Sequence, residues 1–112
     1  MSSEHILVDL GDPLPLELLL TDGNVGKFPQ AIVRDVSTGA TVVGSPFSLT
    51  HLGEGLYRNV AFTPTSVGKF RAVFIIYNES GHTTESIEYP RSTDNFLVID
   101  KVLTIKTFLA LK

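Results

Sequence analysis

The chain has 112 residues, 43% of them hydrophobic, and a formal net charge of −3 at pH 7. This length fits one domain whose core is large enough to fold without a metal or a disulfide. The absence of cysteine excludes thiol nucleophiles, CxxC redox sites, thiolate zinc sites and disulfides. The mild acidic balance argues against a general nucleic-acid binder, which needs a basic face to neutralise phosphates.

The N-terminal residues do not have the pattern of a signal peptide. The sequence starts at Met1 without a basic region, and its first apolar run, residues 6–8, is three residues long. No apolar stretch approaches the roughly 18 residues that cross a bilayer. We therefore expect a protein that is made in the cytoplasm and does not insert into a membrane. A secretory signal removed before residue 1 is the alternative.

The composition favours strands over helices. Val, Ile and Thr together supply 29 residues, whereas Ala supplies five. Turn-forming residues recur every 8–15 positions, a spacing typical of an all-β sandwich or barrel. Segments with a strand-like pattern of apolar residues are 15–21, 30–36, 41–43, 47–52, 56–63, 69–78, 82–89 and 96–99. We expect segment 82–89 to form a hairpin with 69–78.

Segment 69–78 predicts the clearest central strand. Its core-facing side chains are expected to be Phe70, Ala72, Phe74 and Ile76. The opposite, outward face then carries Val73, Ile75 and Tyr77. In segment 15–21, one face is shared by Leu16, Leu18 and Leu20. Leu19 therefore points outward, on the opposite face. A lone soluble sandwich usually places polar residues outward, so this apolar excess indicates a covered surface.

Residues 101–112 form an apolar extension after the domain is complete. Their spacing fits a strand or a helix, and periodicity does not decide between the two. The extension either folds back over its own sandwich or packs on a neighbour, and we favour the neighbour. The predicted partner interface is Val73, Ile75, Tyr77, Val102, Leu103, Ile105, Phe108, Leu109 and Leu111.

Three motifs carry a resemblance to a known family. They are Gly53-Glu-Gly-Leu-Tyr57, Val60-Ala-Phe-Thr-Pro64 and Val67-Gly-Lys-Phe-Arg-Ala-Val-Phe74. The pattern resembles the E–F–G region of immunoglobulin-like modules of filamin-type repeats, bacterial surface proteins and tailed-phage virion proteins. The resemblance covers 14–99 and implies an all-β, immunoglobulin-like antiparallel β-sandwich over 14–100. Residues 1–13 form an N-terminal segment, and 101–112 form the C-terminal extension.

Tyr57 and Phe62 depart from the family spacing by one residue. Because they are five positions apart, a regular strand would place them on opposite faces, although both are large enough to belong in the core. Either a β-bulge near Arg58 and Asn59 reconciles them, or Tyr57 lies at the strand entrance and covers the end of the sandwich.

Candidate chemical residues do not form a recognisable site. The histidines, His5, His51 and His82, have unrelated spacings, and we interpret them as exposed surface residues. Calcium could use Asp9, Asp12, Asp22 and Asn24, but these are also ordinary turn residues. The run Gly53-Glu54-Gly55 lacks the rest of a phosphate loop and predicts a tight turn with positive φ. We expect no catalytic residue, no cofactor and no metal, and hence no enzyme.

These observations predict a non-catalytic structural or interaction subunit, an accessory protein of a larger assembly such as a phage virion. It would be made in the host cytoplasm and located in the virion, with protein partners and a homo-oligomeric state. The alternative is a carbohydrate- or protein-binding module of a bacterial surface or secreted protein, located extracellularly or at the cell surface. That alternative requires an exposed aromatic platform, and its candidates, Phe28, Tyr77, Tyr89 and Phe108, are scattered in the sequence.

Overall fold

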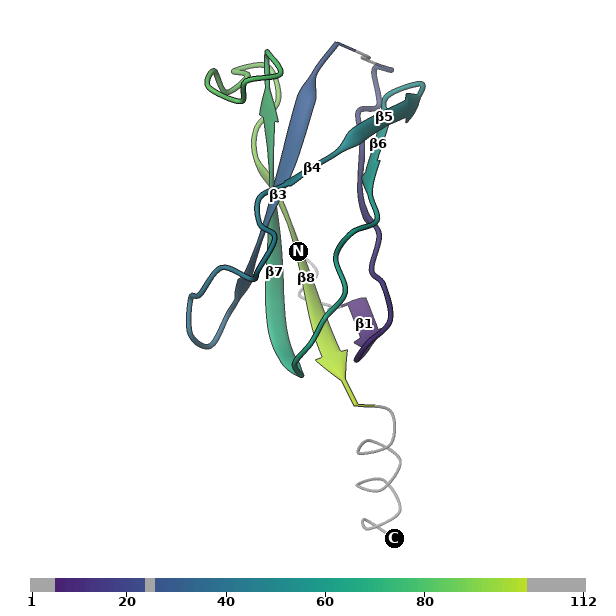
Figure 1. Ribbon diagram of the computed structural model, residues 1–112. Helices are drawn as coiled ribbons and strands as arrows, with labels where there is room; N and C mark the ends of the chain where they lie inside the picture. Colours follow the sequence, from purple (N-terminus) through teal and green to yellow (C-terminus); the bar gives the residue numbers. More distant parts are fainter. Residues whose placement is uncertain (1–5, 24–25, 101–112) are drawn as a thin grey trace, which may run out of the picture.

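The computed structural model describes residues 6–23 and 26–100, and every regular element within them is a β-strand (Figure 1). The prediction of an all-β protein is confirmed. In chain order the strands are β1 (Ile6–Asp9), β2 (Leu16–Leu19), β3 (Phe28–Asp35), β4 (Phe47–Ser48), β5 (Thr50–Gly53), β6 (Leu56–Asn59), β7 (Gly68–Tyr77) and β8 (Ser92–Ile99).

The strands form two sheets. The five-stranded sheet has the order β1-β8-β7-β3-β4, and the three-stranded sheet has the order β2-β6-β5. All pairs are antiparallel except β1 with β8, which run parallel. The expectation of a purely antiparallel arrangement is therefore wrong at β1. That strand lies inside residues 1–13, where no strand was predicted, and its Val8 reaches the core.

The predicted strand 47–52 is divided between the two sheets. Phe47 and Ser48 pair with β3, whereas Thr50 to Gly53 pair with β6. Leu49, between them, is buried at 7% exposure. Apolar residues of this one segment therefore contribute to both sheets, because the chain crosses from one sheet to the other at Leu49, whose side chain is buried in the core.

The predicted hairpin strand 82–89 is wrong. The edge of β7 from Gly68 to Phe74 pairs with β8, which begins at Ser92 and is longer than the predicted 96–99. Only the last residues of β7 remain available to residues 78–91, and they form one isolated bridge, between Tyr77 and Glu85. Pro90 also lacks the N–H that a continuing ladder would need.

Two further predicted strands are shorter than expected. Residues 41–43 contribute only a bridge between Thr41 and Arg34. Strand β6 ends at Asn59, whose amide oxygen accepts a hydrogen bond from Ala61 N at 2.8 Å. Beyond this turn the backbone is irregular, so Phe62 turns inward without a bulge in β6 while Tyr57 stays buried within it.

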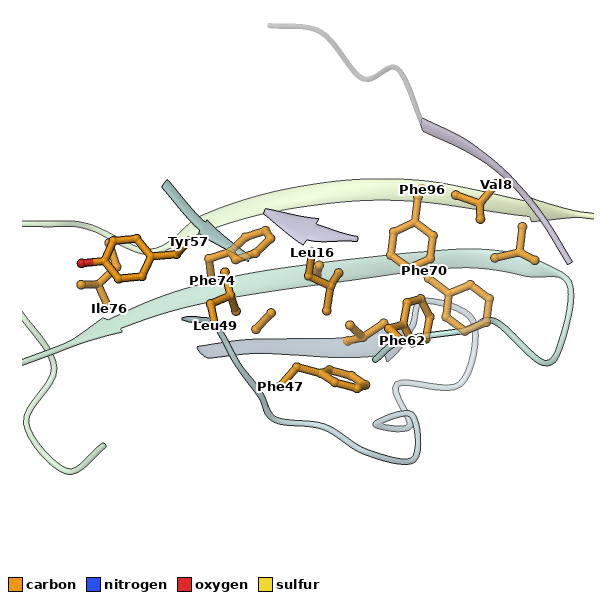
Figure 2. Packing of buried hydrophobic residues seen from close by; sticks show 14 of the residues in the cluster. Val8, Leu16, Phe47, Leu49, Tyr57, Phe62, Phe70, Phe74, Ile76 and Phe96 are labelled. Atoms are coloured by element: carbon orange, nitrogen blue, oxygen red, sulfur yellow. The ribbon is translucent and has the colours of Figure 1, made fainter. Parts of the chain in front are cut away.

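The core lies between the two sheets and draws from both (Figure 2). The predicted inward residues of β2 and β7 belong to it or pack against it, which confirms both alternations. Phe62, Phe70 and Phe96 form one aromatic group near Val8, with centroid separations of 5.6–5.7 Å. Tyr57 and Ile76 lie at the other end of the core. Such edge-to-face and offset contacts add to the free energy gained from burial.

Residues 101–112 lie outside the described part of the chain. The two alternatives for them, a strand or a helix, therefore stay predictions. The described residues contain no helix with the length and hydropathy of a membrane span.

Candidate functional site

The outer face of β7 only partly matches the predicted interface. Val73 and Tyr77 are half-buried on that face. Ile75 is only 4% exposed, yet it is not part of the core cluster. The chain itself therefore already covers Ile75, and a neighbour is not needed to bury it. The six interface residues of the extension, Val102, Leu103, Ile105, Phe108, Leu109 and Leu111, lie outside the described residues.

The register brings together three aromatic side chains that are far apart in the sequence. Phe28 is the direct cross-strand partner of Tyr77 on the outer face of the five-stranded sheet. The ring of His82 packs edge-on against Tyr77, with 5.3 Å between centroids. Phe28 keeps 37% of its surface exposed. Sequence reasoning missed this group because only the pairing register places Phe28 beside Tyr77.

A row of leucines crosses the outer face of the three-stranded sheet. Leu19 of β2 pairs with Leu56 of β6, which is opposite Gly53 of β5. Leu52, at the irregularity in β5, and Leu19 are 52% and 57% exposed. Farther along the same face Arg58 forms an ion pair with Glu17. The outward orientation predicted for Leu19 is confirmed.

Residues 78–91 form a long loop whose backbone is fixed by its own side chains. The carboxylate of Glu79 accepts hydrogen bonds from the backbone N–H groups of Thr84 at 2.9 Å and Thr83 at 3.0 Å. Both donors lower the pKa of Glu79, to about 2, and the N–H group of Thr84 has the larger effect. Asn78 N donates to Thr84 O at 2.9 Å and Ser86 N donates to Ile76 O at 2.8 Å, which ties the loop to the end of β7.

The base of the loop is closed by an ion pair. Arg91 donates two hydrogen bonds to Glu85, from Nε at 3.0 Å and from Nη2 at 2.8 Å. The hydrogen bond from Arg91 lowers the pKa of the Glu85 carboxyl. A bidentate pair of this kind fixes the geometry of both side chains.

A second set of contacts joins the loop to the segment before β3. Lys27 Nζ donates to Asn78 Oδ1 at 2.9 Å and forms an ion pair with Glu88 at 3.2 Å. The same ammonium lies 5.9 Å from the ring centroid of Tyr89, whose hydroxyl donates to Asp22. The loop is thus anchored at several points along its length, and these contacts fix its conformation.

Where this loop runs back beside the end of β7, it presents one apolar side chain to solvent. Ile87 is 100% exposed, although its neighbour Ser86 is 4% exposed. Ser86 Oγ accepts a hydrogen bond from Glu88 N at 3.2 Å, so the backbone on both sides of Ile87 is fixed. The sequence signal for this site is a single isoleucine inside a polar segment, which the prediction of a strand over 82–89 obscured.

A pocket of about 420 Å³ lies at the other end of β7. Its lining includes the buried rings of Phe62 and Phe70, and it opens between residues 35–43 and 62–66. Several hydroxyl groups surround these rings. The pocket carries one carboxylate, Asp35, which accepts hydrogen bonds from Ser37 Oγ at 2.7 Å and Ser37 N at 2.8 Å. Both hydrogen bonds lower the pKa of Asp35, and the bond from the Ser37 hydroxyl has the larger effect.

The predicted turn at Gly53-Glu54-Gly55 is confirmed, since all three residues have positive φ. The description of His51 as an exposed residue is wrong. It is half-buried, its ring centroid lies 5.0 Å from that of Tyr57, and its Nε2 is buried without a hydrogen-bond partner. His82 is also half-buried, and His5 lies outside the described residues.

The acidic candidates for calcium do not form a common site in the structure. No group of three or more potential metal-ligating side chains occurs within 6–23 and 26–100. Asn24 is outside those ranges.

Comparison with known proteins identifies no relative, because no family model, no curated protein and no solved structure matches the chain.

Proposed function

We propose that this chain is a non-catalytic interaction subunit of a larger protein assembly, such as a phage virion. The observation that carries the proposal is the fixed 78–91 loop, in which the side chain of Ile87 is fully exposed. Ordering a residue costs about 1–2 kcal/mol of backbone entropy. Loops longer than about 12 residues without their own secondary structure are uncommon and are usually either functional or disordered linkers, and the hydrogen bonds of this loop order it. An ordered loop that presents an exposed apolar side chain has the form of an anchor for a partner protein.

The strand order supports an immunoglobulin-like interpretation. An immunoglobulin sandwich has strands B, E and D on one sheet and C, F and G on the other. The neighbours β2-β6-β5 and β3-β7-β8 follow these two orders when lettered in chain sequence. Residues 78–91 then correspond to the F–G loop, and residues 20–27, to which Lys27 and Asp22 tie it, correspond to the B–C loop. These two loops lie at the binding end of immunoglobulin variable domains.

Protein partners, self-association among them, and a location in the virion after synthesis in the host cytoplasm belong to the same proposal. The test is sedimentation velocity of the full chain over a concentration series. We expect oligomers, and we expect Ile87→Asp to weaken association at least tenfold, or about 1.4 kcal/mol, because a charge then occupies the apolar contact. Val60→Asp is the matched control, since Val60 is 63% exposed on another loop.

Two results would refute this use of the loop. One is a chain that stays monomeric at every concentration tested. The other is an equal loss of association in Ile87→Asp and Val60→Asp, since a general effect of added charge would then explain both.

A second candidate function is favoured by one observation. Phe28, Tyr77 and His82 form a partly exposed aromatic group, which is the kind of surface on which sugar rings stack. We propose carbohydrate binding as the alternative, with the chain acting as a module of a bacterial surface protein. Titration calorimetry with a panel of oligosaccharides tests it. Binding that Phe28→Ala abolishes and Leu7→Ala preserves would favour this alternative over the virion subunit.

A further inference from the structure

We propose that the outer face of the five-stranded sheet carries a second contact site, where Arg34, Lys69 and Arg71 bind the carboxylates of an acidic segment of a partner protein. This inference rests on the proposed function and adds the chemistry of a partner. It starts from a pair of like charges, Arg34 and Arg71, that lie directly opposite each other on the sheet.

The pairing register places the three cations on one face of the sheet. Arg34 of β3 is the direct cross-strand partner of Arg71 of β7. Because side chains alternate along a strand, Arg71 points away from the core, to which its sequence neighbours Phe70 and Ala72 belong. Lys69 is two positions from Arg71 and therefore shares its face. All three cations are exposed.

Neutral side chains hold both guanidinium groups in place. A row of polar residues crosses the sheet at this level, in the order Thr41, Arg34, Arg71 and Asn95. Arg34 Nη1 donates to Thr41 Oγ1 at 3.2 Å. Arg71 Nε donates to Asn95 Oδ1 at 3.0 Å. Each of these hydrogen bonds engages one of the five N–H groups of a guanidinium, so other donors remain for a ligand.

The charges of this group are not balanced by the chain itself. Like charges directly opposite each other destabilise a sheet, and within 6–23 and 26–100 none of the three cations forms an ion pair. Asp35 follows Arg34 in the sequence, but it lines the pocket on the other face and accepts hydrogen bonds from Ser37. A bound anion offsets the repulsion between the two arginines.

The charge distribution favours carboxylates on a short peptide segment as the ligand. The guanidinium group of arginine binds a planar carboxylate through two parallel N–H groups. A long polyanion such as DNA would extend past the site, onto a body in which residues 1–100 contain twelve acidic and six basic residues. Salt screens exposed charges over about 8–10 Å, so a segment with a few Asp or Glu residues interacts mainly with the three cations.

The test is an NMR titration of the full chain, because the Nε–H groups of arginine give signals of their own. The probes are an acetylated tetraglutamate peptide and its tetraglutamine counterpart, at equal ionic strength. We expect the tetraglutamate peptide to shift the Nε–H signals of Arg34 and Arg71 and the tetraglutamine peptide to leave them in place. Added salt should weaken the binding, since the three cations are exposed.

Arg71→Gln is the main variant, and Arg58→Gln is its matched control, since Arg58 lies on the other sheet in an ion pair with Glu17. We expect Arg71→Gln to weaken binding of the tetraglutamate peptide at least tenfold, because it removes charged hydrogen-bond donors. Arg58→Gln should leave the binding unchanged. Arg71→Gln should also raise the Tm of the free chain by about 1–4 °C, because it removes the repulsion from Arg34. A merely structural role for Arg71 predicts a lower Tm instead.

Failure of this inference is distinguishable from failure of the proposed function. Equal binding of the two peptides, or an equal loss of binding in Arg71→Gln and Arg58→Gln, overturns the site. Tighter binding of a DNA oligonucleotide or of inorganic phosphate overturns the assignment to carboxylates. If Ile87→Asp weakens association while the tetraglutamate peptide does not bind, the role of the loop stands and the basic site is wrong. If the peptide binds to a chain that stays monomeric at every concentration, the site stands and the role of the loop is wrong.

Discussion

Gly55 is the residue whose backbone leaves least room for a side chain. Its φ is +83°, and a Cβ there would lie 2.3 Å from Leu20 O and 3.0 Å from Gly23 Cα. Leu20 N also donates a hydrogen bond to Gly55 O, at 2.8 Å. The turn between β5 and β6 is thus pressed against the segment that follows β2, and glycine is required for that contact.

We therefore expect Gly55→Ala to destabilise the chain by more than about 2 kcal/mol, since backbone strain of about 1–2 kcal/mol adds to the clash. Gly39→Ala is the matched control, because Gly39 has φ +77° but open space around its Cα. It should cost only the strain. Urea unfolding followed by circular dichroism measures both, and equal losses would mean that the close approach at Gly55 contributes nothing.

Phe74 and Ile75 test the two faces of β7. Phe74 is in the core at 3% exposure, and Phe74→Ala should cost about 3–5 kcal/mol. Ile75 is 4% exposed outside that cluster, so Ile75→Thr buries a hydroxyl and should cost about 1–3 kcal/mol even in dilute monomer. Val73→Thr, on the same face but half-buried, should cost under about 1 kcal/mol.

Thermal unfolding at low concentration separates these cases. A negligible effect of Ile75→Thr in the monomer, together with a large one in the oligomer, would restore the sequence-based view that a neighbour covers this side chain.

At the scale of elements, alternation gave the faces of β2 and β7 correctly but not the pairing partners. The pattern of Phe70, Ala72, Phe74 and Ile76 follows from a period of two and from burial on one side. Segment 82–89 was expected to pair with β7, yet β8 occupies the edge of β7 that it would need. Competition between two segments for one edge depends on the whole chain, so local pattern could not decide it.

The candidate site was predictable only in part for the same reason. The apolar outward face of β7 was visible in the sequence, whereas the cross-strand pairing of Phe28 with Tyr77 depends on register. Ile87 was misplaced because the loop conformation is set by Glu79, Glu85 and Arg91 through contacts between side chains and backbone. Such contacts leave no periodic signal in the sequence.

The loop should loosen in acid because of Glu79. Its folded pKa of about 2 lies below the ordinary value of 4.5 for a glutamate, owing to the N–H groups of Thr84 and Thr83. A depressed folded pKa contributes stability that is present above the unfolded pKa and is lost as pH falls through the folded one. We expect faster amide exchange at Thr83 and Thr84, after correction for intrinsic rates, as pH falls from about 4.5 to 2.

Glu79→Gln removes this titration and provides the control. The variant should have a looser loop at neutral pH and little further change in acid. A loop whose protection factors in the original chain stay constant down to pH 2 would show that these hydrogen bonds do not hold it.

At the scale of the whole molecule, charge is distributed unevenly along the chain. Residues 101–112 contain three lysines and no acidic residue, whereas all twelve acidic residues lie in 1–100. The core contains Phe96 and Val98 of β8, both 1% exposed, and its members all lie between Val8 and Val98. A basic and apolar segment therefore follows an acidic sandwich. Within the residues that the structure describes, two sheets already form the core of that sandwich.

Deletion of 101–112 should consequently preserve the fold and lower the oligomeric state. The expected circular dichroism spectrum is that of the full chain, because both sheets keep all their described strands. Sedimentation velocity should show smaller species, since the deletion removes six large apolar residues and three positive charges from the acidic chain. Combining the deletion with Ile87→Asp should give a monomer, as the two changes affect different parts of the molecule. An unfolded deletion variant would instead mean that the extension completes the core of its own chain.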